Sequence, residues 1–196
     1  MSAKTDGRGR AFTVVLPALI VVASVVFAVW LFLPDDAEPQ VDVDAQGPRF
    51  ELPEQLVEAS DLIVVGVVAR VDDGRVLTDP GDPEAGIRTQ LATVEVDAPL
   101  VGDVDDPLVV EQEAELLDGT RVTVNGVAPL APGDRGLMFL VSGDSDEFPY
   151  TAFVNEQAWV PITDDRLDPI DPEDPIWREF VGMRTNEFLA GPADDN

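Results

Sequence analysis

The strongest hydrophobic pattern in the chain is an uncharged run at residues 11–33, which reads AFTVVLPALIVVASVVFAVWLFL. At 1.5 Å of rise per residue, a helix of this length spans about 34 Å, and the hydrocarbon core of a bilayer is about 30 Å thick. A segment inside lipid must satisfy its own backbone hydrogen bonds, and a helix does so. The run therefore predicts a single transmembrane helix that contacts membrane lipid.

The charges on either side of this run predict its orientation. Lys4, Arg8 and Arg10 lie before it, and acidic residues follow it. The positive-inside rule places residues 1–10 in the cytoplasm and residues 34–196 on the outer face of the plasma membrane. A cleaved signal peptide is the alternative, but such a segment has a shorter apolar region that ends in small residues. This run is longer and ends in bulky side chains, which favours an uncleaved anchor.

The segment after the run is first polar and then amphipathic. Residues 34–50 are rich in Asp, Pro and Gly, which predicts a solvated acidic linker. Residues 52–60 predict a short helix with a proline in its first turn, and Leu56 and Val57 are expected to face a core.

The first strand is expected at residues 61–71, which are apolar and largely β-branched. A continuous apolar run of this kind is typical of a strand buried on both faces. Gly66 in its middle predicts a bulge or a sharp bend. The sequence Asp72-Asp73-Gly74 is a turn signal that would end the strand.

Further short segments of strand character follow, with turn signals at close intervals. They are residues 75–78, 88–98, 108–110, 121–124, 136–141, 150–154, 158–162 and 166–167. This spacing favours a mainly β fold, an antiparallel barrel or sandwich over residues 51–170, rather than βαβ units.

The C-terminal region, residues 171–196, predicts a helix and a tail. Asp174 is a candidate N-cap with Pro175 in the first turn, and Gly191 would end a helix at Ala190. Trp177, Val181 and Phe188 would fall on one stripe of such a helix, with Phe180 beside it. This stripe either packs on the β domain or docks a partner.

The order of these elements resembles that of a known type of domain. The residues concerned are Ala59-Ser60-Asp61, Ile63 to Val68, Thr93 to Val96, Pro132-Gly133-Asp134, Leu137 to Leu140 and Trp159 to Leu167. They are similar to uncharacterised exported bacterial domains with an OB-like five-stranded barrel of the netrin-module kind, which includes tissue inhibitors of metalloproteinases. Those inhibitors depend on cysteines that this chain lacks, so the resemblance does not support protease inhibition. It informs the fold only, and implies a small antiparallel OB-like barrel with short flanking helices.

Composition excludes several kinds of chemistry. The chain has 12 basic and 39 acidic residues. Beyond residue 33 it has 9 basic and 38 acidic residues, which gives this part a net charge of −29. This charge disfavours nucleic-acid binding, which depends on basic groups that contact phosphates. The chain has no Cys and no His, so it cannot form a Ser–His or Cys–His nucleophile pair, and it lacks the usual ligands of zinc, copper and haem.

Acidic clusters are the remaining candidates for a cofactor site. Asp144, Asp146 and Glu147 include the D-x-D start of a calcium loop but not its full series of ligands. The pair Asp42 and Asp44 and the cluster Asp103, Asp105 and Asp106 are similar candidates. With 39 acidic residues, a solvated surface explains such clusters better than a Ca²⁺ site.

The two tryptophans beyond residue 33, Trp159 and Trp177, fit a core role better than an exposed ligand platform.

Three functional hypotheses are compatible with the sequence. The first hypothesis is a non-enzymatic extracytoplasmic module that binds another envelope protein. The second is an accessory or structural subunit of a membrane complex, and the third is a hydrolase that uses carboxylates.

Overall fold

The structure is a computed structural model of the chain, and one part of the chain is described in it. The described residues are 40–43, 48–79, 82–104, 107–143, 145 and 149–190. They all belong to the second of two compact units, residues 38–196. Among them, no helix combines the length and apolarity that a membrane crossing needs. The predicted anchor at residues 11–33 and the basic residues Lys4, Arg8 and Arg10 lie outside the described residues.

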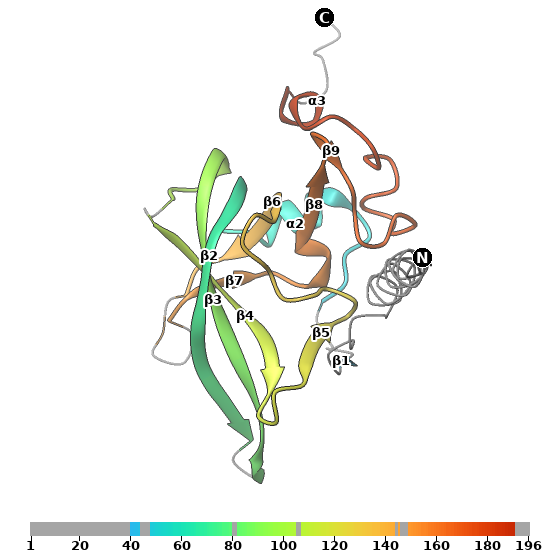
Figure 1. The fold of residues 1–196 in the computed structure, drawn as a ribbon. Coiled ribbons are helices and arrows are strands. Elements are labelled where there is room, and N and C mark those ends of the chain that lie inside the picture. Colours follow the sequence, from blue (N-terminus) through green and yellow to red (C-terminus); the bar gives the residue numbers. More distant parts are fainter. Residues whose placement is uncertain are drawn as a thin grey trace, which may run out of the picture. The chain divides into compact units, whose positions relative to one another are not determined.

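The described unit is mainly β, as predicted (Figure 1). Its strands are β1 (Gln40–Val43), β2 (Leu62–Asp79), β3 (Asp82–Val101), β4 (Leu108–Leu116), β5 (Arg121–Val124), β6 (Arg135–Val141), β7 (Thr151–Phe153), β8 (Trp159–Thr163) and β9 (Arg166–Leu167). Its helices are α2 (Pro53–Glu58), the 3-10 helix η1 (Glu156–Ala158) and α3 (Thr185–Ala190).

Five of these strands pair in a closed ring. β3 is antiparallel to β2 and to β4, and β6 is antiparallel to the other edge of β2. The short strand β7 closes the ring, because it is antiparallel to β6 and parallel to β4. Each of these last two pairings involves only two residue pairs, so the ring is closed most weakly at β7.

The remaining strands extend the sheet beyond the ring. β5 meets β4 at the single pair Glu115–Arg121, and β1 lies parallel to β5. Gln40–Val43 were expected in the linker, but they pair here with Arg121–Val124. On the other side β8 pairs with β6, and β9 pairs with β8.

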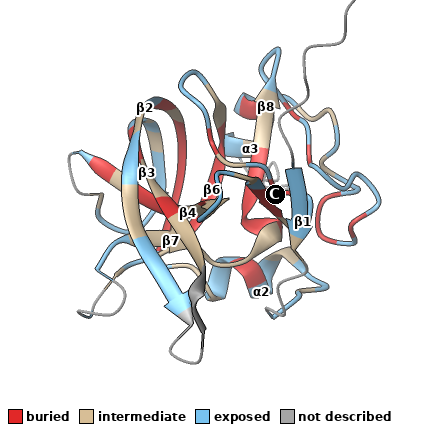
Figure 2. Ribbon diagram, turned by 60° about the horizontal axis from the view of Figure 1, so that its bottom comes forward, coloured by how far each residue is buried: buried red, intermediate tan, exposed pale blue. Residues whose placement is uncertain are grey.

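Two apolar clusters explain the uninterrupted hydrophobicity of β2. Leu62, Val64 and Val68 belong to a cluster shared with β3, β4 and β6, whereas Ile63 and Val65 belong to a second cluster shared with β6, β8 and the C-terminal segment. The predicted burial of this strand on both faces is therefore confirmed. In Figure 2, β1 and the end of β2 toward Asp79 are mostly exposed, whereas the part of β2 from Leu62 to Val68 is mostly buried.

Two glycines allow the strands of the ring to approach closely. Gly66 and Gly136 face each other across β2 and β6. A Cβ atom at Gly66 would lie 2.6 Å from Val94 Cγ1, and one at Gly136 would overlap the indole of Trp159. The register of β2 and β3 shifts at Gly66, so the predicted bulge is confirmed.

The short motifs that carry the family resemblance have structural roles in this chain. The Asp61 carboxylate accepts a hydrogen bond of 2.9 Å from Ser142 N, at the end of β6. In the Pro132-Gly133-Asp134 loop, Gly133 N donates to Val68 O, and Asp134 O accepts from Val68 N. These bonds fix the loops that join the strands of the ring.

Two predicted boundaries are wrong. The expected turn at Asp72-Asp73-Gly74 lies inside β2, which continues with a register shift to Asp79. Residues 82–87, which lie between the predicted strands at 75–78 and 88–98, belong to β3. The turn signal fails because β3 pairs with β2 on both sides of it. Val57 is also exposed, whereas Leu56 is buried as expected.

The C-terminal helix is much shorter than predicted. Only Thr185–Ala190 are helical, and residues 175–182 form successive turns. Gly182 has a φ of +71° and its N–H donates to Leu167 O, while Leu167 N donates to Met183 O. The backbone of this segment bonds to β9, so it cannot continue the bonding of a helix.

Candidate functional site

The acidic clusters predicted from the sequence do not form a site in the described residues. Asp144, Asp146 and Glu147, the candidates for a Ca²⁺ site, lie outside them. Of the other clusters, only Asp42 and Asp103 are described. Within the described residues, no three acidic side chains are grouped as metal ligands would be.

Asp42 has a structural role. Its Oδ1 accepts hydrogen bonds from Thr123 Oγ1 at 2.7 Å and from Gly126 N at 3.0 Å. These two bonds, the first above all, lower the pKa of Asp42 from its ordinary value of 3.8. The carboxylate therefore attaches β1 to β5 and to the turn that follows β5.

Both tryptophans of the described unit are buried, as their core interpretation predicts. Trp159 is 7% exposed and lies against Gly136. Trp177 is 4% exposed, and its Nε1 donates to Gln157 O at 3.0 Å. Trp177 packs at a tilt on Phe139, with 5.6 Å between ring centroids.

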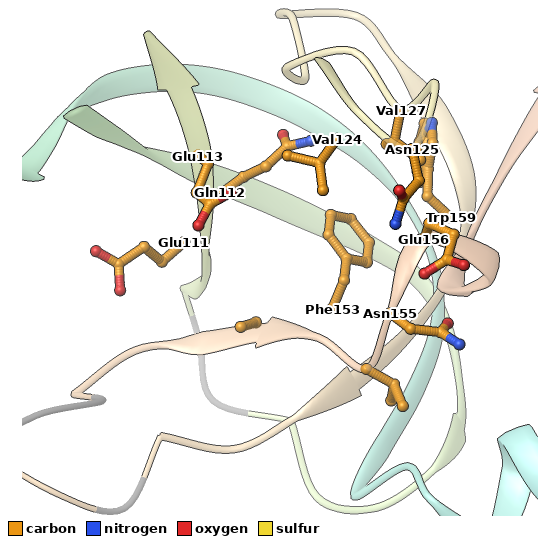
Figure 3. Close-up of a pocket in the computed structure, with 12 residues that line it drawn as sticks. Glu111, Gln112, Glu113, Val124, Asn125, Val127, Phe153, Asn155, Glu156 and Trp159 are labelled. Carbon is orange, nitrogen blue, oxygen red and sulfur yellow. The ribbon is translucent and has the colours of Figure 1, made fainter. Parts of the chain in front are cut away.

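A groove lies between β4 and β5 on one side and the segment from β7 to β8 on the other (Figure 3). Its volume is about 330 Å³. It is lined by Glu111, Gln112, Glu113, Val124, Asn125, Val127, Ala152, Phe153, Val154, Asn155, Glu156 and Trp159. This volume lies at the lower end of the range for ligand pockets.

The pairing of the strands explains why the groove exists. The parallel pairing of β4 with β7 ends at Glu111 and Ala152. The pairing of β4 with β5 involves only Glu115. Between these points, Gln112 and Glu113 have β3 as their partner strand among the described strands. The sheet is therefore open there, and the opening is the groove.

The floor of the groove is apolar. Phe153 lies in the middle of the lining, and Figure 3 shows its ring between the side chains of β4 and those near Trp159. The rings of Phe153 and Trp159 are tilted, with 6.1 Å between centroids. Val124 and Val127 complete the apolar surface, which suits an apolar side chain of a ligand.

The turn beside the floor of the groove has a local sequence signal, Asn125-Gly126, which is not among the turn signals named above. Asn125 and Gly126 have φ values of +50° and +80°, and the backbones of Val124 and Val127 bond to each other in both directions. Asn-Gly is the preferred sequence of a tight hairpin turn. The Asn-Gly pair could therefore have located this wall of the groove.

The rim of the groove carries three carboxylates, which differ in whether a cation lies close to them. Glu111 is 9% exposed and is held by Arg75, through Nε at 2.9 Å and Nη2 at 3.0 Å, and by the Thr89 hydroxyl at 2.8 Å. In Figure 3 its carboxylate points away from the other lining side chains. Glu111 therefore stabilises the wall.

The other two rim carboxylates lack a close cationic partner. The side chain of Glu113 makes no hydrogen bond and no ion pair within the described residues. The side chain of Glu156 is 16% exposed, and its nearest cation is Arg49 Nη1 at 3.9 Å. Arg49 forms its short contact elsewhere, from Nη2 to Asp174 at 2.8 Å. The groove therefore has two carboxylates available for a ligand.

A hydrogen-bond network next to the groove holds this rim in place. Asp174 is 3% exposed, and it accepts bonds from Gln157 Nε2, Arg49 Nη2 and Ile176 N. Gln157 also bonds to Phe50 in both directions. A smaller cavity of about 80 Å³ lies over this network, and it shares Glu156 and other lining residues with the groove.

A separate polar cavity of about 490 Å³ lies at the β8–β9 turn. Arg135, Arg166 and Arg184 line it together with Asp164 and Asp165. Arg135 is neutralised by Asp97 at 3.0 Å and by Asp165 at 2.9 Å. Because this cavity has little apolar surface and mixed charge, it is a weaker candidate than the groove.

Comparison with known proteins finds no matching family model, no matching curated protein and no matching solved structure. Any functional argument therefore depends on the geometry of the groove.

Proposed function

We propose that this chain is a non-enzymatic, membrane-anchored binding module. Residues 11–33 anchor it with the N-terminus in the cytoplasm, and residues 34–196 lie outside, where the groove takes a segment of another envelope protein. The single observation that carries this proposal is the groove itself, which combines an apolar floor with two carboxylates that lack a short ion pair. The uncharged run and the basic residues before it support the anchor.

We also propose that the ring of strands is an OB-like barrel. Numbered along the chain, the strands of the ring occur in the order first, second, third, fifth, fourth, with the only parallel pair between third and fifth. A five-stranded barrel of this kind is a common scaffold for binding extended ligands. The net charge of −29 beyond residue 33 argues against a nucleic acid as the ligand.

Binding fits the groove better than catalysis does. The sequence contains no His and no Cys, so the usual nucleophile pairs cannot form. Of the three rim carboxylates, Glu111 is already neutralised by Arg75 and points away from the groove. An interaction surface needs only shape, apolar area and charge, which the groove supplies.

Fluorine NMR on the full-length chain in detergent micelles tests the binding function. Labelling with 5-fluorotryptophan gives one signal for each of the three tryptophans, and a Trp159→Phe variant assigns the signal from the groove. The probes are three capped hexapeptides that alternate valine with arginine, glutamine or glutamate. We expect at least one probe to shift the Trp159 signal saturably. If no probe shifts it at millimolar concentration, the binding function is wrong.

Protease added to intact cells tests the anchor independently. We expect it to degrade the acidic portion and to leave a short membrane-bound fragment. An acidic portion that is spared, or that is released in soluble form with a new N-terminus, would contradict the proposed topology.

A further inference from the structure

The edge of β4 that faces the groove is open over three residues. Gln112 and Glu113 pair with β3 through Gln90 and Thr89, but on their other side the pairing with β7 ends at Glu111. Such an edge presents backbone N–H and C=O groups to any strand that approaches it. At about 3.3 Å of rise per residue, the open edge is about 10 Å long, which matches a short extended peptide.

The side chain of Gln112 keeps this edge accessible. Its amide accepts a hydrogen bond of 2.9 Å from Leu130 N and donates one of 3.1 Å to Ala128 O. Gln90 holds the same loop through Leu130 O at 3.0 Å. The loop is thus fastened to the side chains of β3 and β4, and it does not use the backbone of β4 as a partner strand would.

The apolar floor sets the second requirement for an occupant. In a strand, alternate side chains point to opposite faces. A strand added along β4 would therefore direct one side chain onto the floor formed by Phe153, Trp159 and Val127, and its neighbours toward the rim. The occupant needs an apolar residue flanked by polar ones.

The charge of the rim sets the third requirement. Glu113 has no ionic partner within the described residues, and Glu156 has only the contact of 3.9 Å with Arg49. Partly buried carboxylates lose hydration, and an opposite charge restores a favourable environment. An acidic or a nucleic-acid ligand would be repelled, whereas arginine or lysine side chains would be attracted.

We infer that the groove binds an extended basic peptide segment by strand addition to the open edge of β4, with an apolar side chain on Phe153 and Trp159 and basic side chains on Glu113 and Glu156. This inference rests on the proposed binding function and names its ligand class. We assign the segment to a second protein chain, because the basic residues of this chain outside the described ranges are Lys4, Arg8 and Arg10, which the proposed topology places on the other side of the membrane.

Peptide titration of the full-length chain in micelles tests the inference. The probes are the capped Arg-Val, Gln-Val and Glu-Val hexapeptides, and the readout is the Trp159 signal. We expect the Arg-Val peptide to bind at least about tenfold more tightly than the Gln-Val peptide and to weaken as salt increases. If the Gln-Val or Glu-Val peptide binds as tightly, the inference is wrong while the binding function stands. If none binds, both are wrong.

Matched charge variants test which carboxylates are used. Glu113→Gln and Glu156→Gln should each weaken binding of the Arg-Val peptide by about three- to tenfold. The control is Glu95→Gln on β3, which removes the same charge at an exposed position outside the groove. It should change the affinity by less than about twofold, because an exposed charge that does not line the groove is screened by solvent and salt. Equal weakening by all three variants would reduce the effect to net charge and overturn the inference.

N-methylated peptides test strand addition itself. In an extended peptide, alternate N–H groups point to the same side, so methylating alternate nitrogens in either of two registers removes the donors of one side. We expect at least one register to lose more than tenfold in affinity. Undiminished binding of both registers would exclude pairing with β4.

Discussion

Replacing Gly136 by alanine is expected to disturb both the ring and the floor of the groove. Gly136 lies on β6 opposite Gly66, and an added methyl group would overlap the Trp159 indole and lie 2.8 Å from Val160 O. The backbone of β8 cannot move easily, because Trp159 and Val160 pair with β6. The indole must therefore move, and the groove and the smaller cavity beside it, both of which it lines, are the open spaces described next to it.

The magnitude follows from two opposing effects. Forcing an extra methyl group into a packed core costs about 1–3 kcal/mol, and replacing glycine by alanine recovers about 0.4–1 kcal/mol through the unfolded state. The net loss is then about 1–2 kcal/mol, which lowers the melting temperature of a domain of this size by roughly 2–8 °C.

Thermal unfolding followed by near-UV circular dichroism measures this loss, and a second variant isolates its cause. In a Trp159→Leu background, the loss caused by Gly136→Ala should shrink to less than half, because the clash is removed. Gly119→Ala measures backbone strain without a clash, since nothing lies near its Cβ position and only its φ of +86° opposes the change. Its cost should be the same with and without Trp159. If Gly136→Ala also costs the same without Trp159, the reasoning is wrong.

Three further predictions concern other parts of the unit. Thr89→Val should destabilise by about 1–3 kcal/mol in chemical denaturation, because it removes a hydroxyl that bonds to the buried carboxylate of Glu111; an unchanged midpoint would contradict this. The pKa of Asp42 is lowered in the folded state, so its stabilisation of β1 is present above pH 3.8 and should disappear as the pH falls below it; amide exchange of β5 that is no faster at pH 2.5, after correction for intrinsic rates, would refute that role. Asp164 has a φ of +52° in the β8–β9 turn, so Asp164→Gly should stabilise by about 0.5–1 kcal/mol, and a lower melting temperature would be the opposite result.

The sequence predicts the parts of this fold that depend on local chemistry. The run from Leu62 to Val68 identifies a doubly buried strand, and Gly66 identifies its bulge. A turn is also found at residues 117–120, between the predicted strands at 108–110 and 121–124, where Asp118 Oδ1 accepts a bond from Thr120 N. Each of these features is decided by residues that are close together in the chain.

Features that depend on distant partners were missed. The turn signal at Asp72-Asp73-Gly74 is overridden by β3, and the expected helix after Pro175 is replaced by turns that bond to β9. The groove could not be predicted, because Glu113 and Glu156 line one groove only where the pairing of β4 with β7 ends. No local pattern records where a strand lacks a neighbour.

The ring of strands is closed by the short strand β7, so it can open there while its other pairings stay intact. The ring opens when the pairs at Val110, Glu111, Leu140 and Val141 separate together with the bond from Val154 N to Phe139 O, whereas the long pairing of β2 with β3 stays intact. Phe153 belongs to β7 and also to the floor of the groove. Under the proposed function, a ligand that contacts Phe153 would stabilise the pairing of β7, so its affinity and the population of the open ring would be linked through one equilibrium.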